Sequence, residues 1–304
     1  AYEAAKGKNK VGTTGKGIGP TYSDKAARVG LRVGDILHNF DEKYKALKAR
    51  HEQILRDLHY TDYDITEEEQ KWMQGIEYMR KFNLTDTEYE LNHALAEGKN
   101  VLAEGAQGSL LDIDHGTYPY VSSSSTTSGG VCTGLGIAPN SIGHVFGIFK
   151  AYSTRVGGGP FPVELFDETG DTIRHIGNEY GAVTGRNRRC GWLDLVALKY
   201  AIMINGVTDL VMMKGDVLDG FDTIKVCTAY TKDGETVTEM PYDTEGWQPV
   251  YEDLPGWKTD LTAIRAEKDF PAAFASYIAY IEKATGTPIK IVSVGPDREA
   301  TIIR

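Results

Sequence analysis

Residues 209–216 read Asp-Leu-Val-Met-Met-Lys-Gly-Asp, an apolar run that stops at a glycine flanked by a cation and a carboxylate. Three more short apolar runs, at 101–103, 145–149 and 289–294, also lead into polar loops that contain glycine. Such runs are typical of strands that are buried on both faces of a mostly parallel sheet. We therefore expect strands at these positions, with ligands binding at their carboxyl ends.

Helical periodicity separates several of these runs. Residues 192–205 and 271–285 carry apolar side chains at helical spacing, and each stretch is followed by a glycine, Gly206 or Gly286. Glycine favours the left-handed backbone geometry found just beyond a helix end. The alternation of strands and helices predicts an α/β fold with a large, mostly parallel central sheet and flanking helices.

The stretch 35–98 has a different texture and is predicted to be a largely helical subregion. Apolar residues recur every three or four positions over 35–58. Thr66 and Glu69 have the spacing of a capping box, which predicts a second helix, and a third helical pattern covers 87–98.

The chain has 304 residues and a formal net charge of −10, from 43 Asp and Glu against 33 Lys and Arg. This balance argues against a nucleic-acid partner. No stretch reaches the roughly 18 apolar residues of a membrane span, and no secretory signal is visible, so we expect no membrane partner and a cytoplasmic location. Cys132, Cys190 and Cys227 lack CxxC spacing and are expected to be buried, reduced thiols. We assign 1–304 to a single domain, with surface excursions at 228–270.

The loop from Gly12 to Pro20 (GTTGKGIGP) is the first candidate site. Its glycines let the backbone approach a ligand while hydroxyls and amides offer hydrogen-bond donors. The pattern is not a Walker A motif, so it is either a phosphate cradle or a flexible turn. A helix is expected to start next and to place Lys25 and Arg28 three residues apart, where two cations suit an anion.

Polar loops after residue 103 form the next candidates. Gln107 follows a predicted strand and can donate its amide to a carbonyl or an oxyanion. The spacing of Asp112, Asp114 and His115 suits a hydrogen-bonded loop better than a metal site. Residues 122–130 (SSSSTTSGG) have the composition of a linker, but their apolar flanks favour an ordered loop.

Residues 184–189 (TGRNRR) place three arginines within four positions. Arginines this close repel one another unless an anion lies between them, so the loop is either an anion site or a solvated charged loop. Two further loops, 214–216 and 293–298, each follow a predicted strand. A carboxylate there can accept hydrogen bonds from both N1–H and the amino group of guanine.

Taken together, these loops resemble adenylosuccinate synthetase, the family that joins IMP and L-aspartate at the expense of GTP in the first committed step of AMP synthesis. The resemblance covers essentially the whole chain. Its motifs are GTTGKGIGPTYSDKAARVGLRVGD (12–35), EGAQGSLLDIDHGTYPYV (104–121), the run from VCTGLGI through FKAYSTRVGGGPFP (131–162, with the latter at 149–162), TGRNRRCGWLDLVALKY (184–200) and SVGPDR (293–298). The resemblance implies a P-loop-NTPase-like α/β fold, a GTP-dependent C–N ligase and a homodimer.

The resemblance also implies site residues. Lys25 and Gln107 would be catalytic. IMP would be bound by Thr14, Arg28, Gln107, Ser122 and Arg186, with Arg28 reaching the IMP phosphate of the neighbouring subunit. Aspartate would be bound by Ala182, Val183, Thr184, Gly185, Arg186, Asn187 and Arg188. GTP would be bound by Arg188, Lys214, Gly215, Asp216, Ser293, Val294 and Gly295.

The sequence departs from the family pattern at several places. Family members extend further at the amino end, where a GDEGKGK-type phosphate loop, a catalytic aspartate and a catalytic histidine reside. We therefore expect an N-terminally truncated member, with no metal ligands of its own and the Mg²⁺ ligands mainly in the absent part. Ser122 stands where threonine is usual, Gly215 where an apolar residue is usual, and Asn187 interrupts the arginine run.

The family reaction explains these residue types. GTP phosphorylates the oxygen on C6 of IMP after a base removes the ring proton, and the aspartate amine then displaces phosphate. Because the family's base is the absent aspartate, we expect the 304 residues alone to be inactive. Two alternatives remain: a non-catalytic nucleotide-binding or dimerisation module that kept the fold, and an unrelated anion-binding α/β ligase.

Overall fold

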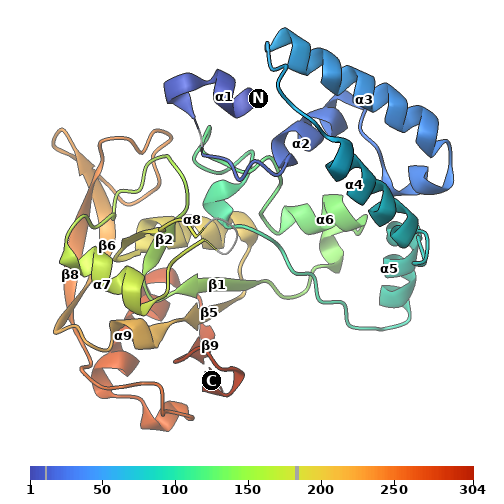
Figure 1. Cartoon of the computed structure of the whole chain (residues 1–304). Helices are drawn as coiled ribbons and strands as arrows, with labels where there is room; N and C mark the ends of the chain where they lie inside the picture. Colours follow the sequence, from blue (N-terminus) through green and yellow to red (C-terminus); the bar gives the residue numbers. More distant parts are fainter. Residues whose placement is uncertain (11, 182–184) are drawn as a thin grey trace. The chain divides into compact units, whose positions relative to one another are not determined.

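The computed structural model describes residues 1–10, 12–181 and 185–304 (Figure 1). The chain divides into two compact units, the first made of Ala1–Glu104 and Thr133–Ile137 and the second of Gly105–Cys132 and Ala138–Arg304. The assignment of the whole chain to a single domain stays a prediction.

The first unit is built from helices. Its elements are α1 (Tyr2–Ala5), η1 (Gly7–Asn9), α2 (Ile18–Ala27), η2 (Val33–Leu37), α3 (Phe40–Asp57), α4 (Thr66–Met79) and α5 (Thr87–Ala96). A small core of Ile36, Phe40 and Ile76 joins η2, α3 and α4. On the same helices, Tyr44 and Trp72 stack with Phe40 and with each other. These apolar and aromatic contacts hold the helical stretch together.

Two helix starts in this unit differ in part from the prediction. The pattern over 35–58 is interrupted before α3 because Asn39 adopts a left-handed backbone with φ 52°. The predicted helix start at Thr66 is confirmed, but the predicted capping box is wrong, because Ile65 is the N-cap of α4 and its side chain makes no capping hydrogen bond. The Asp64 carboxylate accepts the Thr66 amide at 2.9 Å and the Thr66 hydroxyl at 2.6 Å, while Glu69 pairs with a lysine of α3.

The second unit contains the predicted sheet. Its strands β1 (Phe146–Lys150), β5 (Asp209–Met213), β9 (Ile289–Ser293) and β10 (Thr301–Ile303) follow the order β1-β5-β9-β10. β1, β5 and β9 are parallel, and β10 is antiparallel to β9. Leu210, Met212 and Val292 from the central strands are buried in the main core. The α/β fold with a parallel-rich sheet is thereby confirmed.

The predicted strand at 101–103 is wrong. These residues have no strand structure, and Leu102 is 90% exposed. A strand needs a neighbour for its backbone N–H and C=O groups, and the described part of the chain supplies none to this run. Apolar composition alone therefore misled the prediction.

Strands also occupy part of the stretch 228–270, where surface excursions were expected. β6 (Thr223–Lys232) pairs in parallel with β4 (Leu193–Asp194) and antiparallel with β7 (Glu235–Val237) and β8 (Gln248–Pro255). β2 (Ser153–Arg155) pairs antiparallel with β3 (Arg189–Gly191). Ala229 and Tyr230 of β6, which lie within that stretch, are buried, so the expectation of a surface excursion is wrong for this part of β6.

The remaining helices begin at or after residue 129 of the sequence. They are α6 (Gly129–Leu135), α7 (Glu168–Ile176), α8 (Leu195–Asn205) and α9 (Ala272–Thr285), with short turns η3 (Ser109–Leu111), η4 (Pro139–Ser141), η5 (Gly215–Leu218), η6 (Glu267–Asp269) and η7 (Arg298–Ala300). Gly206 and Gly286 have φ 60° and 67°, which confirms the left-handed ends predicted for α8 and α9. α8 starts at Leu195 rather than at Trp192 because Asp194 caps it, accepting the Ala197 amide at 3.0 Å. Within the described ranges, none of the helices has the length and apolarity needed to cross a membrane.

Candidate functional site

The carboxyl ends of β1, β5 and β9 lie at one edge of the parallel sheet (Figure 1). Lys150, the last residue of β1, is the register partner of Met213, the last residue of β5. Met212 pairs in turn with Val292 near the end of β9. Lys150, Lys214 and the segment 293–295 therefore emerge beside one another, at the edge where α/β sheets bind ligands.

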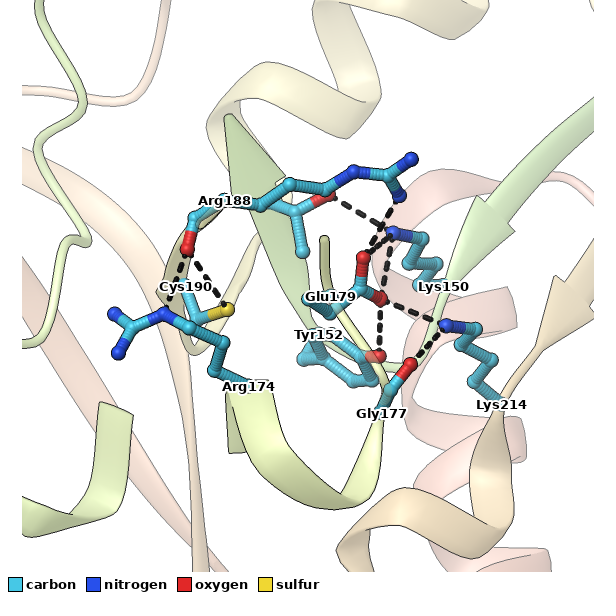
Figure 2. Close-up of polar contacts among 9 residues, drawn as sticks. Lys150, Tyr152, Arg174, Gly177, Glu179, Arg188, Cys190 and Lys214 are labelled. Carbon is cyan, nitrogen blue, oxygen red and sulfur yellow. Dashed lines mark hydrogen bonds and ion pairs between the residues drawn. The ribbon is translucent and has the colours of Figure 1, made fainter. Parts of the chain in front are cut away.

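A cluster of charged side chains surrounds Glu179 at this edge (Figure 2). Lys150 Nζ lies 2.8 Å from both carboxylate oxygens, and Lys214 Nζ lies 2.9 Å from Oε1. Arg188 donates from a terminal nitrogen to Oε2 at 2.8 Å, and the Tyr152 hydroxyl donates to Oε1 at 2.5 Å. These five residues, Lys150, Tyr152, Glu179, Arg188 and Lys214, are called the Glu179 cluster below.

Electrostatics keep Glu179 ionised. Its side chain is 0% exposed, and burial alone raises the pKa of a carboxyl group. Hydrogen bonds from Lys150, Tyr152 and Lys214 outweigh that effect and hold the pKa of Glu179 at about 2. Burial also lowers the pKa of Lys150, an effect that its bonds to Glu179 oppose.

The Glu179 cluster carries more positive than negative charge. Three cations contact one carboxylate, which leaves two positive charges unbalanced within the cluster. The Nε of Arg188 is buried and has no hydrogen-bond partner in the described part of the chain. In a protein whose net charge is −10, a local surplus of this kind suits a phosphate or carboxylate ligand.

The loop after β5 carries Lys214, Gly215 and Asp216. Lys214 adopts a left-handed backbone with φ 60°, and its ammonium group donates to the Gly177 carbonyl at 2.6 Å as well as to Glu179. Burial raises the pKa of Asp216, which lies in η5. A Cβ added to Gly215 would lie 2.8 and 2.9 Å from ring atoms of Phe274, so only glycine fits. The departure from the family pattern at this position therefore has a steric reason.

The loop after β9 is tightly folded. Ser293 donates its hydroxyl to the Gly295 carbonyl at 3.0 Å, and the Val294 amide donates to the Ala300 carbonyl at 3.0 Å. Ser293 and Val294 are buried, so these residues present backbone rather than side chains to a ligand.

Asp112 organises the loops that contain Gln107 and Ser122. It is buried, and Oδ1 accepts the amides of Asp114 and His115, both at 3.0 Å. Oδ2 accepts the amides of two threonines, at 2.6 and 3.2 Å, from the serine-rich stretch. These four backbone bonds outweigh burial and lower the pKa of Asp112. Asp112 thus has the loop-forming role that its spacing favours over metal ligation. Residues 122–128 form the predicted ordered loop, whereas Gly129 and Gly130 begin α6.

Arg155 links this loop to a glycine turn. Its guanidinium group is buried and donates to the Gly158 carbonyl at 2.9 Å, the Thr117 hydroxyl at 2.9 Å and the Tyr120 carbonyl at 3.2 Å. Arg189 donates to the carbonyl of Gly159 in the same turn at 2.7 Å. Two arginines therefore fix the turn that follows β2.

Comparison with known proteins places the chain in a family. The family model described as adenylosuccinate synthetase matches residues 1–302. The chain is 65% identical over 305 residues to adenylosuccinate synthetases of Bacteroides thetaiotaomicron and of Phocaeicola vulgatus, and the match covers 100% of this chain and 72% of each relative. It also matches a structure of fully ligated adenylosuccinate synthetase from Plasmodium falciparum with TM-score 0.93 and 39% identity, over 100% of this chain and 73% of that one.

The chain belongs to the adenylosuccinate synthetase family. The family resemblance seen in the sequence motifs is thereby confirmed, and so is membership of a ligase family. The matches place no ligand, so the roles of individual residues stay predictions.

The structure brings together part of the adenylosuccinate synthetase site predicted from sequence. The predicted GTP residues that follow β5 and β9 lie at one sheet edge, and Arg188 and Lys214 meet at Glu179. Arg186 lies on the same segment as Arg188, and its carbonyl accepts the Gly181 amide at 2.8 Å. Asn187 forms an isolated bridge with Tyr180, and Gly185 has φ 63°. Ala182, Val183 and Thr184 lie outside the described residues.

The other predicted residues are divided between the two units. Thr14, Lys25 and Arg28 belong to the first unit, with Lys25 in the last turn of α2 and Arg28 directly after it. Gln107 and Ser122 belong to the second unit, where the Ser122 amide donates to the Leu111 carbonyl at 2.8 Å.

Backbone geometry singles out three of the predicted site residues. Arg28, Gln107 and Lys214 have φ values of 63°, 64° and 60°, a region that few residues other than glycine adopt. Strained conformations of this kind are concentrated at functional sites, although a helix end also explains Arg28. The observation therefore supports Gln107 and Lys214 more strongly than Arg28.

Sequence reasoning missed several residues of the site, above all Lys150, Tyr152 and Glu179. The motif 149–162 contains the first two, and their position at the end of a predicted strand was an available signal. Glu179 had no signal, because its importance comes from contacts with segments distant in the sequence.

The side chains that commonly bind metal ions are scattered in the described residues. The described ranges contain no group of three or more His, Cys, Asp or Glu side chains that could hold one. Both oxygens of Asp112 are engaged by backbone amides. Asp112 is therefore committed to backbone amides rather than to a metal ion.

Proposed function

We propose that the protein acts in the GTP-dependent ligation of IMP and L-aspartate to adenylosuccinate, with 6-phosphoryl-IMP as the intermediate. Family membership supports ligase chemistry. The single observation that carries the nucleotide assignment is the surplus of positive charge at the carboxyl edge of the sheet, beside the carboxylate of Asp216.

The GTP contacts belong to the loops at this edge. Asp216 would accept hydrogen bonds from N1–H and the amino group of guanine, a pattern that adenine does not offer. Lys214, Gly215 and the segment 293–295 would line the guanine pocket with backbone groups. Arg188 would contact GTP with the donors that Glu179 leaves available.

The IMP and aspartate contacts belong to the remaining loops. Gln107, Ser122 and Arg186 would bind IMP together with Thr14 and Arg28. The segment 182–188 would bind the carboxylates of aspartate through its arginines, because guanidinium groups match carboxylate geometry. A homodimer in which Arg28 reaches the partner's IMP, a requirement for Mg²⁺ and a cytoplasmic location belong to the same proposal.

The chemistry follows from these roles. The C6 oxygen of IMP forms a bond to the γ-phosphorus of GTP, GDP leaves, and the ring loses its N1 proton to a base. The amine of aspartate then bonds to C6, the C6–O bond breaks, and inorganic phosphate leaves. Negative charge develops on phosphoryl oxygens, where the Gln107 amide and nearby cations such as Lys25 stabilise it.

We further propose that the 304 residues expressed alone are inactive or nearly so. They span 72% of the length of the relatives, and the resemblance places the base in a motif that these residues do not contain. A non-catalytic nucleotide-binding module is the alternative that the same experiment examines.

Calorimetry with GDP tests the proposal. We expect the chain to bind GDP and to discriminate against ADP, and Asp216→Asn to weaken GDP binding by about 10- to 100-fold, the effect of losing hydrogen bonds to a charged group. Equal affinity for ADP and GDP would remove the guanine assignment. An assay with GTP, IMP and aspartate completes the test, because robust turnover would contradict the predicted inactivity while supporting the ligase.

A further inference from the structure

The Glu179 cluster is layered, with the carboxylate inside and the cations outside. Glu179 is 0% exposed, whereas the side chains of Lys150, Arg188 and Lys214 are 24%, 30% and 34% exposed. Figure 2 shows the three cationic groups converging on the carboxylate. A ligand at the sheet edge can therefore reach the cations but not Glu179.

The three cations come from separate segments. Lys150 ends β1, Arg188 precedes β3 and Lys214 follows β5. Glu179 also bonds through its backbone, because its carbonyl accepts the Arg188 amide at 3.0 Å. One side chain therefore joins three loops that approach the edge independently.

We propose that Glu179 is a positioning residue, which holds the cations of the nucleotide site in place without touching the nucleotide. The inference rests on the proposed function, because it takes Arg188 and Lys214 as GTP contacts. Buried like charges repel one another unless an anion lies among them, and Glu179 is the carboxylate that all three cations share.

The surroundings of Glu179 are built to keep this arrangement. Gly177 supplies a carbonyl to Lys214, and a Cβ added at Gly177 would collide with the Tyr152 hydroxyl. Lys150 also donates to the Thr154 hydroxyl at 3.0 Å. The lysines are thus held at two points each, so their ammonium groups have defined positions before a ligand arrives.

The variant Glu179→Gln in the 304-residue chain tests the proposal. It keeps the shape of the side chain and removes its charge. We expect GDP affinity, measured by calorimetry, to fall by about 10- to 100-fold. The matched control is Glu282→Gln, which removes a carboxylate bound by Arg304 and by the amide at the start of β9, at the opposite end of that strand. We expect the control to bind GDP like the wild type.

A pH series separates positioning from a general loss of structure. Burial lowers the pKa of Lys150, and the negative charge of Glu179 opposes this effect. In Glu179→Gln that charge is missing, so the pKa of Lys150 falls further. GDP affinity of Glu179→Gln should therefore decline at a lower alkaline pH than that of the wild type. Glu179 and Lys150 interact with the ionisable groups of Tyr152, Arg188, Cys190 and Lys214, while Asp216 acts on Tyr152 and Arg174 acts on Cys190. Burial raises the pKa of the Tyr152 hydroxyl and raises that of the Cys190 thiol to about 11, so neither group explains a decline that begins at a lower alkaline pH.

A charge-matched double variant keeps the test decisive if Glu179→Gln fails to fold. Glu179→Gln combined with Lys150→Met removes one anion and one cation, so repulsion within the cluster is reduced. We expect this chain to fold and to bind GDP more tightly than Glu179→Gln, or measurably where Glu179→Gln is unfolded. No gain from the second substitution would contradict the proposal.

The outcomes separate the two ideas. A wild-type chain that binds no guanine nucleotide overturns the proposed function and this inference together. Wild-type binding that Glu179→Gln leaves unchanged, in affinity and in pH profile, overturns the positioning role alone.

Discussion

Glu179 and Asp112 are both buried carboxylates in the second unit, but they are satisfied in different ways. Asp112 accepts four backbone amides, so it fixes loops without any cation. Glu179 accepts three cationic side chains and a hydroxyl, so it gathers positive charge. A carboxylate bound by amides builds local architecture, whereas one bound by cations creates a surface that attracts anions. The four predictions below compare these roles of buried carboxylates in folding and in binding.

Asp112→Ala should have the largest effect on folding. It leaves four backbone amides without an acceptor, which we expect to lower the free energy of unfolding by about 4 kcal/mol in urea titrations. The neighbouring Asp114→Ala is the control, since Asp114 is exposed and should change stability by less than about 0.5 kcal/mol. Equal effects of the two substitutions would show that the amide bonds of Asp112 are not what holds the loops.

Acid should weaken the Glu179 cluster next most strongly. The folded-state pKa of Glu179, about 2, lies below the ordinary value of 4.5, so its stabilisation is complete above pH 4.5 and is lost as the pH falls towards 2. The shift corresponds to about 3 kcal/mol. Urea titrations between pH 5 and pH 2 should show a smaller loss for Glu179→Gln than for the wild type. Parallel pH profiles for the two chains would contradict this origin of the acid sensitivity.

Arg186→Ala should affect binding rather than folding, because its predicted role is contact with IMP and aspartate. We expect capture of these ligands to weaken by about 1.5–3 kcal/mol, the scale of a lost charged hydrogen bond, in the intact enzyme. Steady-state titration of each substrate measures this effect. Lys225→Ala provides a control with the same change in charge, since Lys225 pairs with Asp253 on the surface. A substrate dependence like that of the control would remove Arg186 from the site.

Tyr152→Phe should have the smallest effect. It removes one hydrogen bond to Glu179 and keeps every charge of the cluster, so we expect a loss of about 1 kcal/mol in unfolding free energy. GDP affinity should change by less than about threefold, because the cations keep their anion. A loss of affinity as large as that of Glu179→Gln would mean that the hydroxyl, and not the charge, holds the cluster.

The sequence predicted the parallel sheet well because each of its parallel strands contains a short run of apolar residues. Residues 210–212 of β5 and Ile289, Val292 and Ser293 of β9 are buried in the middle of the sheet, and their mostly apolar composition identifies the two strands. β6 and β8 were missed because exposed or partly buried residues, several of them charged, interrupt the apolar residues along both strands. The prediction of a strand at 101–103 failed for the opposite reason, because an apolar run forms a strand only where a neighbouring strand pairs with its backbone.

The candidate site was predictable where its charged residues are close together in the sequence. The arginine-rich stretch 184–189 and the loop 214–216 stand out by composition and by their place in the chain. Glu179 does not, because it is an ordinary glutamate until β1, β3 and β5 bring cations to it. The stabilising contacts of a buried ion cluster are long-range, and one sequence without its fold does not reveal them.

The contact between Gly215 and Phe274 has a consequence for sequence variation. The ring fills the volume that a side chain at position 215 would need. Relatives with a bulky residue at position 215 should carry a residue smaller than phenylalanine at position 274. The two positions are therefore expected to evolve as a pair.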